Sequence, residues 1–281
     1  MTERTYSEVV ETARNYYNSK DAQNFYSIIW GGEDLHLGIY DSLEDDIFSA
    51  SRRTIDEMTK FADKIDEHTK IIDLGGGFAG SARHLVKKYG CNIAVLNLSE
   101  VENEYGRKLN KEQGLDDKID VIDGSFENVP YDDNTFDIVW SQDAILHSGE
   151  REKAIKEAAR VLKPGGEMIF TDPMQTGDCD KEILKPIYER IQLSSLGSPE
   201  FYKEKAKKYG LKFLNFKEMP HQLSNHYAKV LQETEKNKDK LKGKVSDEYI
   251  NNMKKGLQHW IDGGRNGNLT WGIFHFRKEN S

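Results

Sequence analysis

The sequence predicts an α/β fold built on a mostly parallel β-sheet. Two observations carry this prediction. From Lys70 onward, short apolar segments alternate with stretches of helical amphipathic pattern, and strands that alternate with helices at this spacing form βαβ units. The first apolar segment is followed by a glycine-rich turn, residues 75–80, which opens a helix. The chain has 281 residues, a length that suits a single domain with inserted helices.

The first part of the chain, residues 1–69, is predicted to form a helical cap. Between residues 45 and 65, apolar side chains recur at helical spacing and fall near one face. They are Ile47, Ala50, Ile55, Met58, Ala62 and Ile65.

The sheet core is predicted to comprise residues 70–218 and 269–277. Seven apolar segments supply its strands: residues 71–74, 92–98, 119–122, 136–140, 167–171, 211–216 and 269–276. Helices are expected at 81–89 and 101–113, each stopped by a glycine, and a third helix ends at Lys163-Pro164-Gly165-Gly166. We expect the last strand to be an antiparallel partner at the sheet edge.

Beyond Asp172 the pattern loosens. Helices are expected at residues 183–193 and 199–209, and residues 219–268 form an inserted helical segment that is a candidate lid. Its stretch 232–244 is rich in Lys and Glu, which favours a solvated helix over a binding patch.

Composition excludes several classes of protein. The net charge of −8 disfavours nucleic acid as a partner, and the two cysteines have neither a CxxC spacing nor a His/Cys cluster, so no disulfide framework or metal site is expected. The polar N-terminus does not resemble a signal peptide, and no apolar run approaches the roughly eighteen residues of a membrane span. We therefore expect a cytoplasmic protein with no membrane partner; a homo-oligomer stays open.

The glycine turn indicates a nucleotide-like ligand. Gly75-x-Gly77-x-x-Gly80 follows a strand and opens a helix, but it also fits the dinucleotide fingerprint or a turn without a ligand. Asp73 precedes the glycines. A carboxylate there repels a pyrophosphate and suits a ligand that carries an amine and a sulfonium. S-adenosylmethionine is such a ligand.

The segment around Asp73 resembles the first motif of class I S-adenosylmethionine-dependent methyltransferases. The resemblance implies a Rossmann-like, seven-stranded, mostly parallel sheet with an antiparallel last strand, and S-adenosylhomocysteine as the product. Asn97, followed by Leu98, stands where most such enzymes have an acidic residue for the ribose. The resemblance further assigns other residues to the cofactor: Gly75, Gly76, Gly77, Gly124, Ser125, Phe126 and Gln142.

The chain more specifically resembles the sarcosine/dimethylglycine N-methyltransferases, which are close to the glycine/sarcosine enzymes and lead to the osmoprotectant glycine betaine. The resembling segments include Tyr26 with Trp30-Gly31-Gly32, Leu96-Asn97-Leu98-Ser99, Trp140-Ser141-Gln142-Asp143-Ala144, Asp172-Pro173-Met174, His226-Tyr227 and the tryptophan-rich C-terminal part. The resemblance implies sarcosine and dimethylglycine as acceptors, with Pro173 and Met174 beside them. We also assign Tyr26 and Trp30 to the cofactor.

The chemistry of methyl transfer to an amine suggests further candidates. His147 follows the motif that faces the methyl group, so it is a candidate base or orienting group, or a residue with only local hydrogen bonds. Arg265 and the Tyr227 hydroxyl are candidates to clamp the acceptor carboxylate. Aromatic rings, including Trp271, could bind a quaternary ammonium by cation–π attraction, although for each single ring core packing is the commoner role.

Other functions are compatible with parts of the pattern. They are methylation of another small amine such as glycine or phosphoethanolamine, methylation of a lipid, a nicotinamide oxidoreductase, and a non-catalytic module that binds S-adenosylmethionine. Asp73, and the missing acidic residue at Asn97, argue against the oxidoreductase. The number of methyl groups added stays open, because one methyl changes pocket selectivity only modestly.

Overall fold

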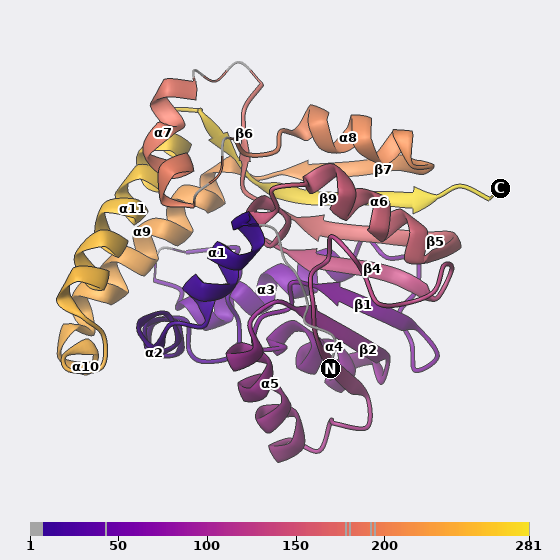
Figure 1. Cartoon of the computed structure of the whole chain (residues 1–281), viewed down its shortest axis with the longest axis horizontal. Helices are drawn as coiled ribbons and strands as arrows, with labels where there is room; N and C mark the ends of the chain where they lie inside the picture. Colours follow the sequence, from indigo (N-terminus) through magenta and orange to yellow (C-terminus); the bar gives the residue numbers. More distant parts are fainter. Residues whose placement is uncertain are drawn as a thin grey trace.

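A seven-stranded sheet forms the centre of the molecule in a computed structural model that describes residues 8–42, 44–177, 179, 181–191, 193 and 195–280 (Figure 1). The strand order is β3-β2-β1-β4-β5-β9-β7. Its strands are β1 (Lys70–Leu74), β2 (Asn92–Asn97), β3 (Ile119–Asp123), β4 (Phe136–Gln142), β5 (Leu162–Thr171), β7 (Leu211–Glu218) and β9 (Gly272–Lys278). The pairings among β1 to β5 are parallel, and β9 runs antiparallel to both of its neighbours. The predicted fold class is confirmed.

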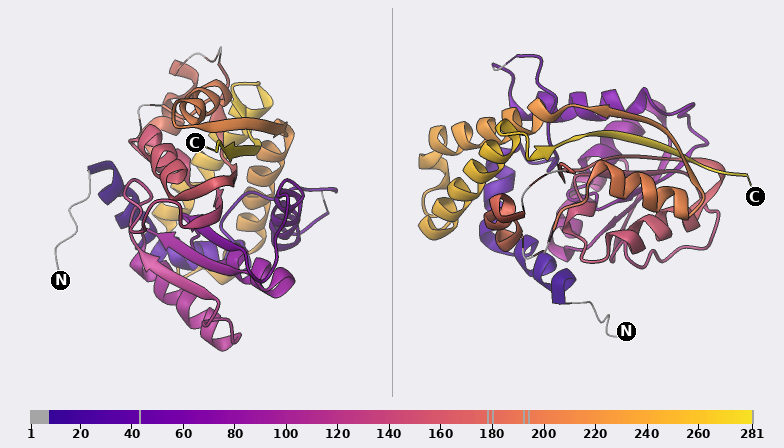
Figure 2. Two further views of the ribbon diagram at one scale, coloured as in Figure 1. Left: turned by 90° about the vertical axis from the view of Figure 1, so that its right-hand side faces the viewer. Right: turned by 90° about the horizontal axis from the view of Figure 1, so that it is seen from above.

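Helices cover both faces of this sheet. In chain order they are α1 (Glu8–Tyr17), α2 (Lys20–Ile29), α3 (Ile47–Thr59), α4 (Gly80–Tyr89), α5 (Glu100–Glu112), α6 (Arg151–Val161), α7 (Lys181–Arg190), α8 (Pro199–Lys208), α9 (Pro220–Lys236), α10 (Lys238–Leu241) and α11 (Asp247–Arg265), with the short 3₁₀ turn η1 (Ile145–His147). The right-hand view of Figure 2 shows the sheet between α8 on one side and the purple helices α3 and α4 on the other.

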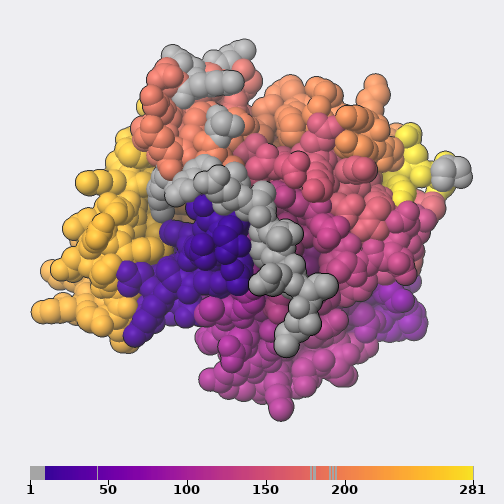
Figure 3. All heavy atoms as spheres, viewed as in Figure 1, coloured from indigo at the N-terminus to yellow at the C-terminus, as the bar shows by residue number. Residues whose placement is uncertain are grey.

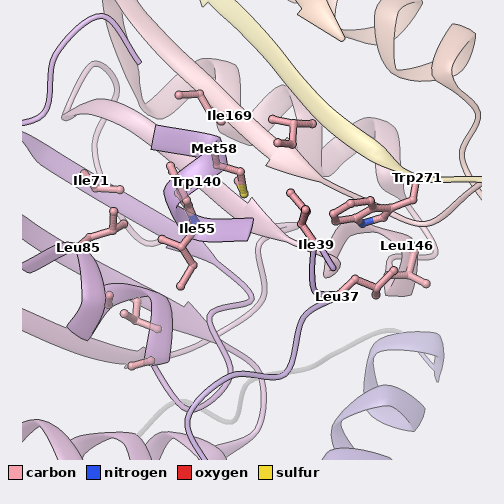
Figure 4. Close-up of a cluster of buried hydrophobic side chains, with 14 of the residues drawn as sticks. Leu37, Ile39, Ile55, Met58, Ile71, Leu85, Trp140, Leu146, Ile169 and Trp271 are labelled. Carbon is pink, nitrogen blue, oxygen red and sulfur yellow. The ribbon is translucent and has the colours of Figure 1, made fainter. Parts of the chain in front are cut away.

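Two cores lie on the two faces of the sheet because side chains alternate along each strand. In β1, Ile71 points to the core under α3 and α4, whereas Ile72 and Leu74 belong to the core under α6 and α8. The first core extends along the sheet to Trp271, which lies near Leu146 in Figure 4. The long apolar runs of the central strands follow from burial on both faces.

The position predicted for the last strand is wrong. The apolar run breaks at Trp271: a short strand, β8 (Leu269–Thr270), pairs with β6 (Met174–Gln175) outside the main sheet, and β9 lies between β5 and β7. The reason is burial, since Ile273 faces one core while Phe274 and Phe276 face the other. The edge is occupied by β7, most of which is exposed.

The boundary between α6 and the fifth strand also differs from the prediction. The helix before the fifth strand does end, at Val161, but Lys163-Pro164-Gly165-Gly166 belong to the strand that follows. The fifth strand therefore begins at Leu162 and not at Glu167.

A third apolar cluster joins the N-terminal helices to the helices that follow β7. Phe25, Ile29 and Trp30 pack with Val230 and Leu257, so α2 lies against α9 and α11 although these are some 200 residues later in the chain (Figure 1). In the space-filling view, α1 (indigo) lies at the surface between the yellow helices and α5 (Figure 3).

The glycine turn connects β1 to α4 in a way that other residues would not permit. Gly75 has a φ of 81°, and a Cβ there would lie 2.3 Å from the Cβ of Ala144. At Gly80 a Cβ would lie 2.1 Å from the carbonyl oxygen of Glu33. The glycines therefore allow the loop before α3 and the end of β4 to approach this turn closely.

Within the described ranges, no helix is both long and apolar enough to cross a membrane.

Candidate active site

A cavity opens at the carboxyl ends of β1, β2 and β4, and its volume is about 880 Å³ when the open space at its mouth is included. This is where an open α/β sheet binds its ligand. Most of the predicted cofactor residues line it: Asp73, Gly75, Gly76, Gly77, Asn97, Leu98, Ser125, Phe126 and Gln142. Gly124 does not line it but belongs to the turn after β3 that carries Ser125.

Asp73 provides the negative charge at the end of β1. Its side chain is buried and faces the cavity, and burial raises the pKa of its carboxyl from 3.8 to about 7. Such a carboxyl gains most from a cation that enters the cavity, because the cation restores the ionised form. The ammonium group of adenosylmethionine fits this position.

Gln142, the last residue of β4, provides a hydrogen-bond donor in the wall of the same cavity. Its Oε1 accepts from Ser81 Oγ at 2.6 Å and from Trp140 Nε1 at 2.9 Å, and these two donors fix the orientation of the amide. Its Nε2 is buried without a partner among the described residues. An unpartnered buried donor is costly unless a ligand satisfies it, so this amide suits an acceptor atom of the cofactor.

A second cavity, of about 1000 Å³, adjoins the first. Ala13, Tyr17, Leu35, Asp143 and His147 line both. The remaining wall is mainly aromatic and aliphatic, and it consists of Thr12, Tyr16, Tyr26, Trp30, Leu37, Leu146, Pro173, Ile191, Tyr227, Met253, Leu257 and Trp260. Among the described lining residues there is no Arg or Lys.

Tyr26 and Trp30 occupy this second cavity and do not line the first. They were predicted to bind the cofactor; the packing of α2 against α9 and α11 places them in the wall of the second cavity. Pro173 and Tyr227, which were predicted to bind the acceptor, line the same cavity.

His147 stands where the two cavities meet, and its Nε2 lies 3.0 Å from the hydroxyl oxygen of Tyr17. The turn that carries it, η1, is held by Asp172, whose Oδ1 accepts from the Leu146 backbone N–H at 3.0 Å. Tyr17 comes from α1, which is tied to α5 by an ion pair between Arg14 and Glu100 at 2.8 Å. The pair of Tyr17 and His147 therefore joins α1 to η1 where the two cavities meet.

Asp143 is a site residue that the sequence analysis missed as a functional candidate. Its Oδ2 accepts from the Leu37 backbone N–H at 2.6 Å, and its Oδ1 accepts from Trp271 Nε1 at 2.7 Å. Its φ of 53° turns the side chain out of the line of β4. The signal was present in the sequence, because an acidic residue follows directly after the end of a strand, beside Gln142.

Three predicted acceptor residues line neither cavity. Trp271 is fully buried and its Nε1 donates to Asp143, and Met174 is buried in β6. Arg265 is exposed in the last turn of α11 and lines neither cavity. In the part of the chain that the structure describes, no group of His, Cys, Asp and Glu residues could hold a metal ion.

Residues 72–170 match the methyltransferase domain family. With this sheet order, the glycine turn and Asp73, the chain is a class I methyltransferase that uses S-adenosylmethionine.

Relatives that match nearly the whole chain identify its family within the methyltransferases. The chain is 51% identical over 278 residues to a sarcosine/dimethylglycine N-methyltransferase of Halorhodospira halochloris, covering 99% of this chain and 100% of that one. It is 50% identical over 273 residues to the enzyme of that name from Aphanothece halophytica, with 96% and 98% covered. A crystal structure from Galdieria sulphuraria, provisionally assigned as a sarcosine dimethylglycine methyltransferase, matches with a TM-score of 0.90 at 42% identity, covering 95% and 100%. The chain belongs to the sarcosine/dimethylglycine N-methyltransferase family.

Proposed function

We propose that this enzyme transfers methyl groups from S-adenosylmethionine to the nitrogen of sarcosine and of dimethylglycine, giving dimethylglycine and glycine betaine. The observation that carries this proposal is the aromatic second cavity, which meets the cofactor cavity at Tyr17, Asp143 and His147. The acceptors named for the relatives agree with it.

The second cavity suits an amine that is finally converted to a quaternary ammonium, whose positive charge is permanent. The stacked rings of Tyr227 and Trp260, with centroids 5.2 Å apart, and the ring of Trp30 offer faces for cation–π attraction. Asp143 adds a negative charge at the junction. These groups support binding of the amine end of the acceptor and of a quaternary ammonium product.

The carboxylate of the acceptor needs hydrogen-bond donors, and tyrosine hydroxyls can supply them. Burial raises the pKa of Tyr26 well above its ordinary value of 10, so this hydroxyl keeps its proton; Tyr16 and Tyr227 line the same cavity. Neutral donors suit a carboxylate with one negative charge. A phosphate carries up to two, and the absence of Arg and Lys from the described lining disfavours phosphoethanolamine.

Catalysis requires the amine to be unprotonated and aligned with the methyl group. The apolar wall favours the neutral amine. The Tyr17 hydroxyl, which lies 3.0 Å from His147 Nε2, can pass its hydrogen to Nε2 and receive the proton of the amine in exchange. Adenosylmethionine supplies a methyl group on a sulfonium, which reacts with the nitrogen lone pair in line. The protein's own contribution is to orient the amine and to exclude water.

We also propose that the cap, residues 1–69, and the inserted segment, residues 219–268, act together as a lid on a single methyltransferase domain. Residues of α1, α2, α9 and α11 supply much of the wall of the second cavity, which supports this role. A closed wall would keep water away from the reacting atoms.

The test is a methyl-transfer assay on purified protein with glycine, sarcosine, dimethylglycine and phosphoethanolamine, each alone, with adenosylhomocysteine and the methylated product both measured. We expect turnover on sarcosine or dimethylglycine, ending in betaine. His147→Asn should lose most of this turnover, and His259→Asn, at an exposed position of α11, is the matched control. Cofactor binding without turnover on any of these amines would refute the proposed acceptors.

A further inference from the structure

The end of β2 lacks the acidic residue that usually binds a nucleotide ribose. In folds of this kind, an Asp or Glu about 20 residues beyond the glycine turn accepts hydrogen bonds from the ribose hydroxyls. Here the last residue of β2 is Asn97, which lines the cofactor cavity and is 8% exposed. An amide offers one acceptor oxygen and no charge, so the ribose site is incomplete if it depends on Asn97 alone.

The hydrogen bonds around Asn97 fix the orientation of its amide. Its Nδ2 donates to Glu102 Oε2 at 3.0 Å and to Asn103 Oδ1 at 3.1 Å. Asn103 is itself oriented, because its Nδ2 donates to the Asn97 carbonyl at 2.9 Å and to Asp123 Oδ1 at 2.8 Å. Both amide hydrogens of Asn97 are thus used within the protein. Its Oδ1 is left as an acceptor on a side chain that lines the cavity.

Glu102 brings a carboxylate to the same place. It is the third residue of α5, and its backbone N–H donates to the N-cap Ser99 Oγ at 3.2 Å. The pattern Ser99-x-x-Glu102 is that of a capping box, in which the Glu side chain would return to the backbone N–H of Ser99. The side chain instead accepts from Asn97. It is 4% exposed, and it lines the cofactor cavity.

Burial of the ionised Glu102 side chain costs free energy, and a hydrogen bond from a ligand would reduce this cost. Within the described part of the chain, Glu102 has no basic partner, and only its Oε2 accepts a hydrogen bond. Burial raises the pKa of Glu102 from 4.5 to about 7. The first turn of a helix favours a negative charge and so offsets part of that burial. A hydroxyl that donates to Oε1 from the cavity would stabilise the ionised form further.

We propose that Glu102 supplies the carboxylate that the end of β2 lacks, and that Glu102 Oε1 and Asn97 Oδ1 together accept the two ribose hydroxyls of the cofactor. Two acceptors on side chains joined by a 3.0 Å hydrogen bond match the two neighbouring donors of a cis-diol. The ribose-binding residue has therefore moved from the strand to the first turn of the next helix. The inference concerns the cofactor and holds whichever amine is methylated.

The test measures binding of S-adenosylhomocysteine and of its 2′-deoxy and 3′-deoxy analogues to the full chain by calorimetry at pH 8. Glu102→Gln keeps an oxygen for Asn97 and removes the charge, and Glu102→Ala removes both. We expect S-adenosylhomocysteine to bind about 10-fold more weakly to Glu102→Gln and about 10- to 100-fold more weakly to Glu102→Ala. Glu104→Gln, at an exposed position of the same helix, is the matched control and should bind like the wild type.

The deoxy analogues separate a direct contact from a structural role. If Glu102 accepts from a ribose hydroxyl, the loss caused by Glu102→Gln should shrink to less than about twofold for the analogue that lacks this hydroxyl. The same loss for all three ligands would mean that Glu102 only supports the loop, and would overturn the proposal. Unchanged binding of S-adenosylhomocysteine to Glu102→Gln would overturn it as well. Neither result depends on the acceptor, so both are distinguishable from a failure of the proposed function.

Discussion

Replacing Asp73 by Asn tests the electrostatic basis of cofactor binding. The substitution keeps the size of the side chain and removes its charge. Burial raises the pKa of Asp73 from 3.8 to about 7, and a ligand cation that fully reversed this change would contribute about 4 kcal/mol above pH 7. Desolvation of the ammonium reduces this gain, and a hydrogen bond between charged groups is worth about 1.5–3 kcal/mol. We therefore expect S-adenosylhomocysteine, which keeps the ammonium, to bind about 10- to 100-fold more weakly to Asp73→Asn.

Isothermal titration calorimetry at pH 8 measures this directly, with Asp120→Asn as the control. Asp120 is an exposed aspartate on β3, which is separated from β1 by β2, and it does not line the cavity, so its substitution changes the net charge equally without touching the cofactor site. Repeating the titration at pH 6 adds a check, because the wild-type affinity should fall as Asp73 becomes protonated while the affinity of Asp73→Asn should change less. Equal affinities of Asp73→Asn and Asp120→Asn at pH 8 would refute the assignment of Asp73 to the ammonium group.

Three further substitutions and one pH series test the rest of the site. Tyr17→Phe removes the hydroxyl that is hydrogen-bonded to His147. The kcat should fall about tenfold, while the Kd of S-adenosylhomocysteine stays within about twofold. A parallel loss of affinity for S-adenosylhomocysteine would show that Tyr17 merely closes the cavity. His147→Phe should lower kcat about 100-fold, and full activity would remove His147 from the mechanism. Asp143→Asn should raise the KM for dimethylglycine about tenfold, measured in initial-rate assays alongside thermal unfolding; an unchanged KM would contradict a role in holding the amine. The Tm of Asp73→Asn relative to wild type should increase from pH 5 to pH 8. A buried acid with a raised pKa keeps its proton in the folded state, so wild-type stability declines as the pH rises from about 4 to about 7. A difference in Tm that stays constant over this pH range would contradict a raised pKa of the Asp73 carboxyl.

Much of the fold could be predicted because it depends on local pattern. The strands of β1 to β5 are apolar runs bounded by glycine or polar turns, and the glycine turn follows the first of them. The positions of Asp73 and Gln142 in the wall of the cavity could be predicted for the same reason, since the carboxyl ends of parallel strands meet at one edge of the sheet.

The place of the last strand could not be predicted, because strand order depends on contacts between segments far apart in the chain. The run 269–276 contains apolar residues that suit either an edge or an interior strand. Only the packing of Ile273 against one core and of Phe274 against the other puts β9 between β5 and β7. Arg265 shows the same limit, since its charge suited a carboxylate clamp but its helix ends at the surface.

The sequence by itself determined the class of fold, the cofactor and the edge of the sheet where the cofactor binds, since these follow from periodicity and from the residues at the strand ends. The tertiary structure decided which side chains from other segments complete the site. Tyr17 reaches His147 because α1 folds over the sheet, and the backbone N–H of Leu37, from the loop before α3, reaches the Asp143 carboxylate at the end of β4. Such pairs depend on the three-dimensional path of the chain, which local spacing does not record.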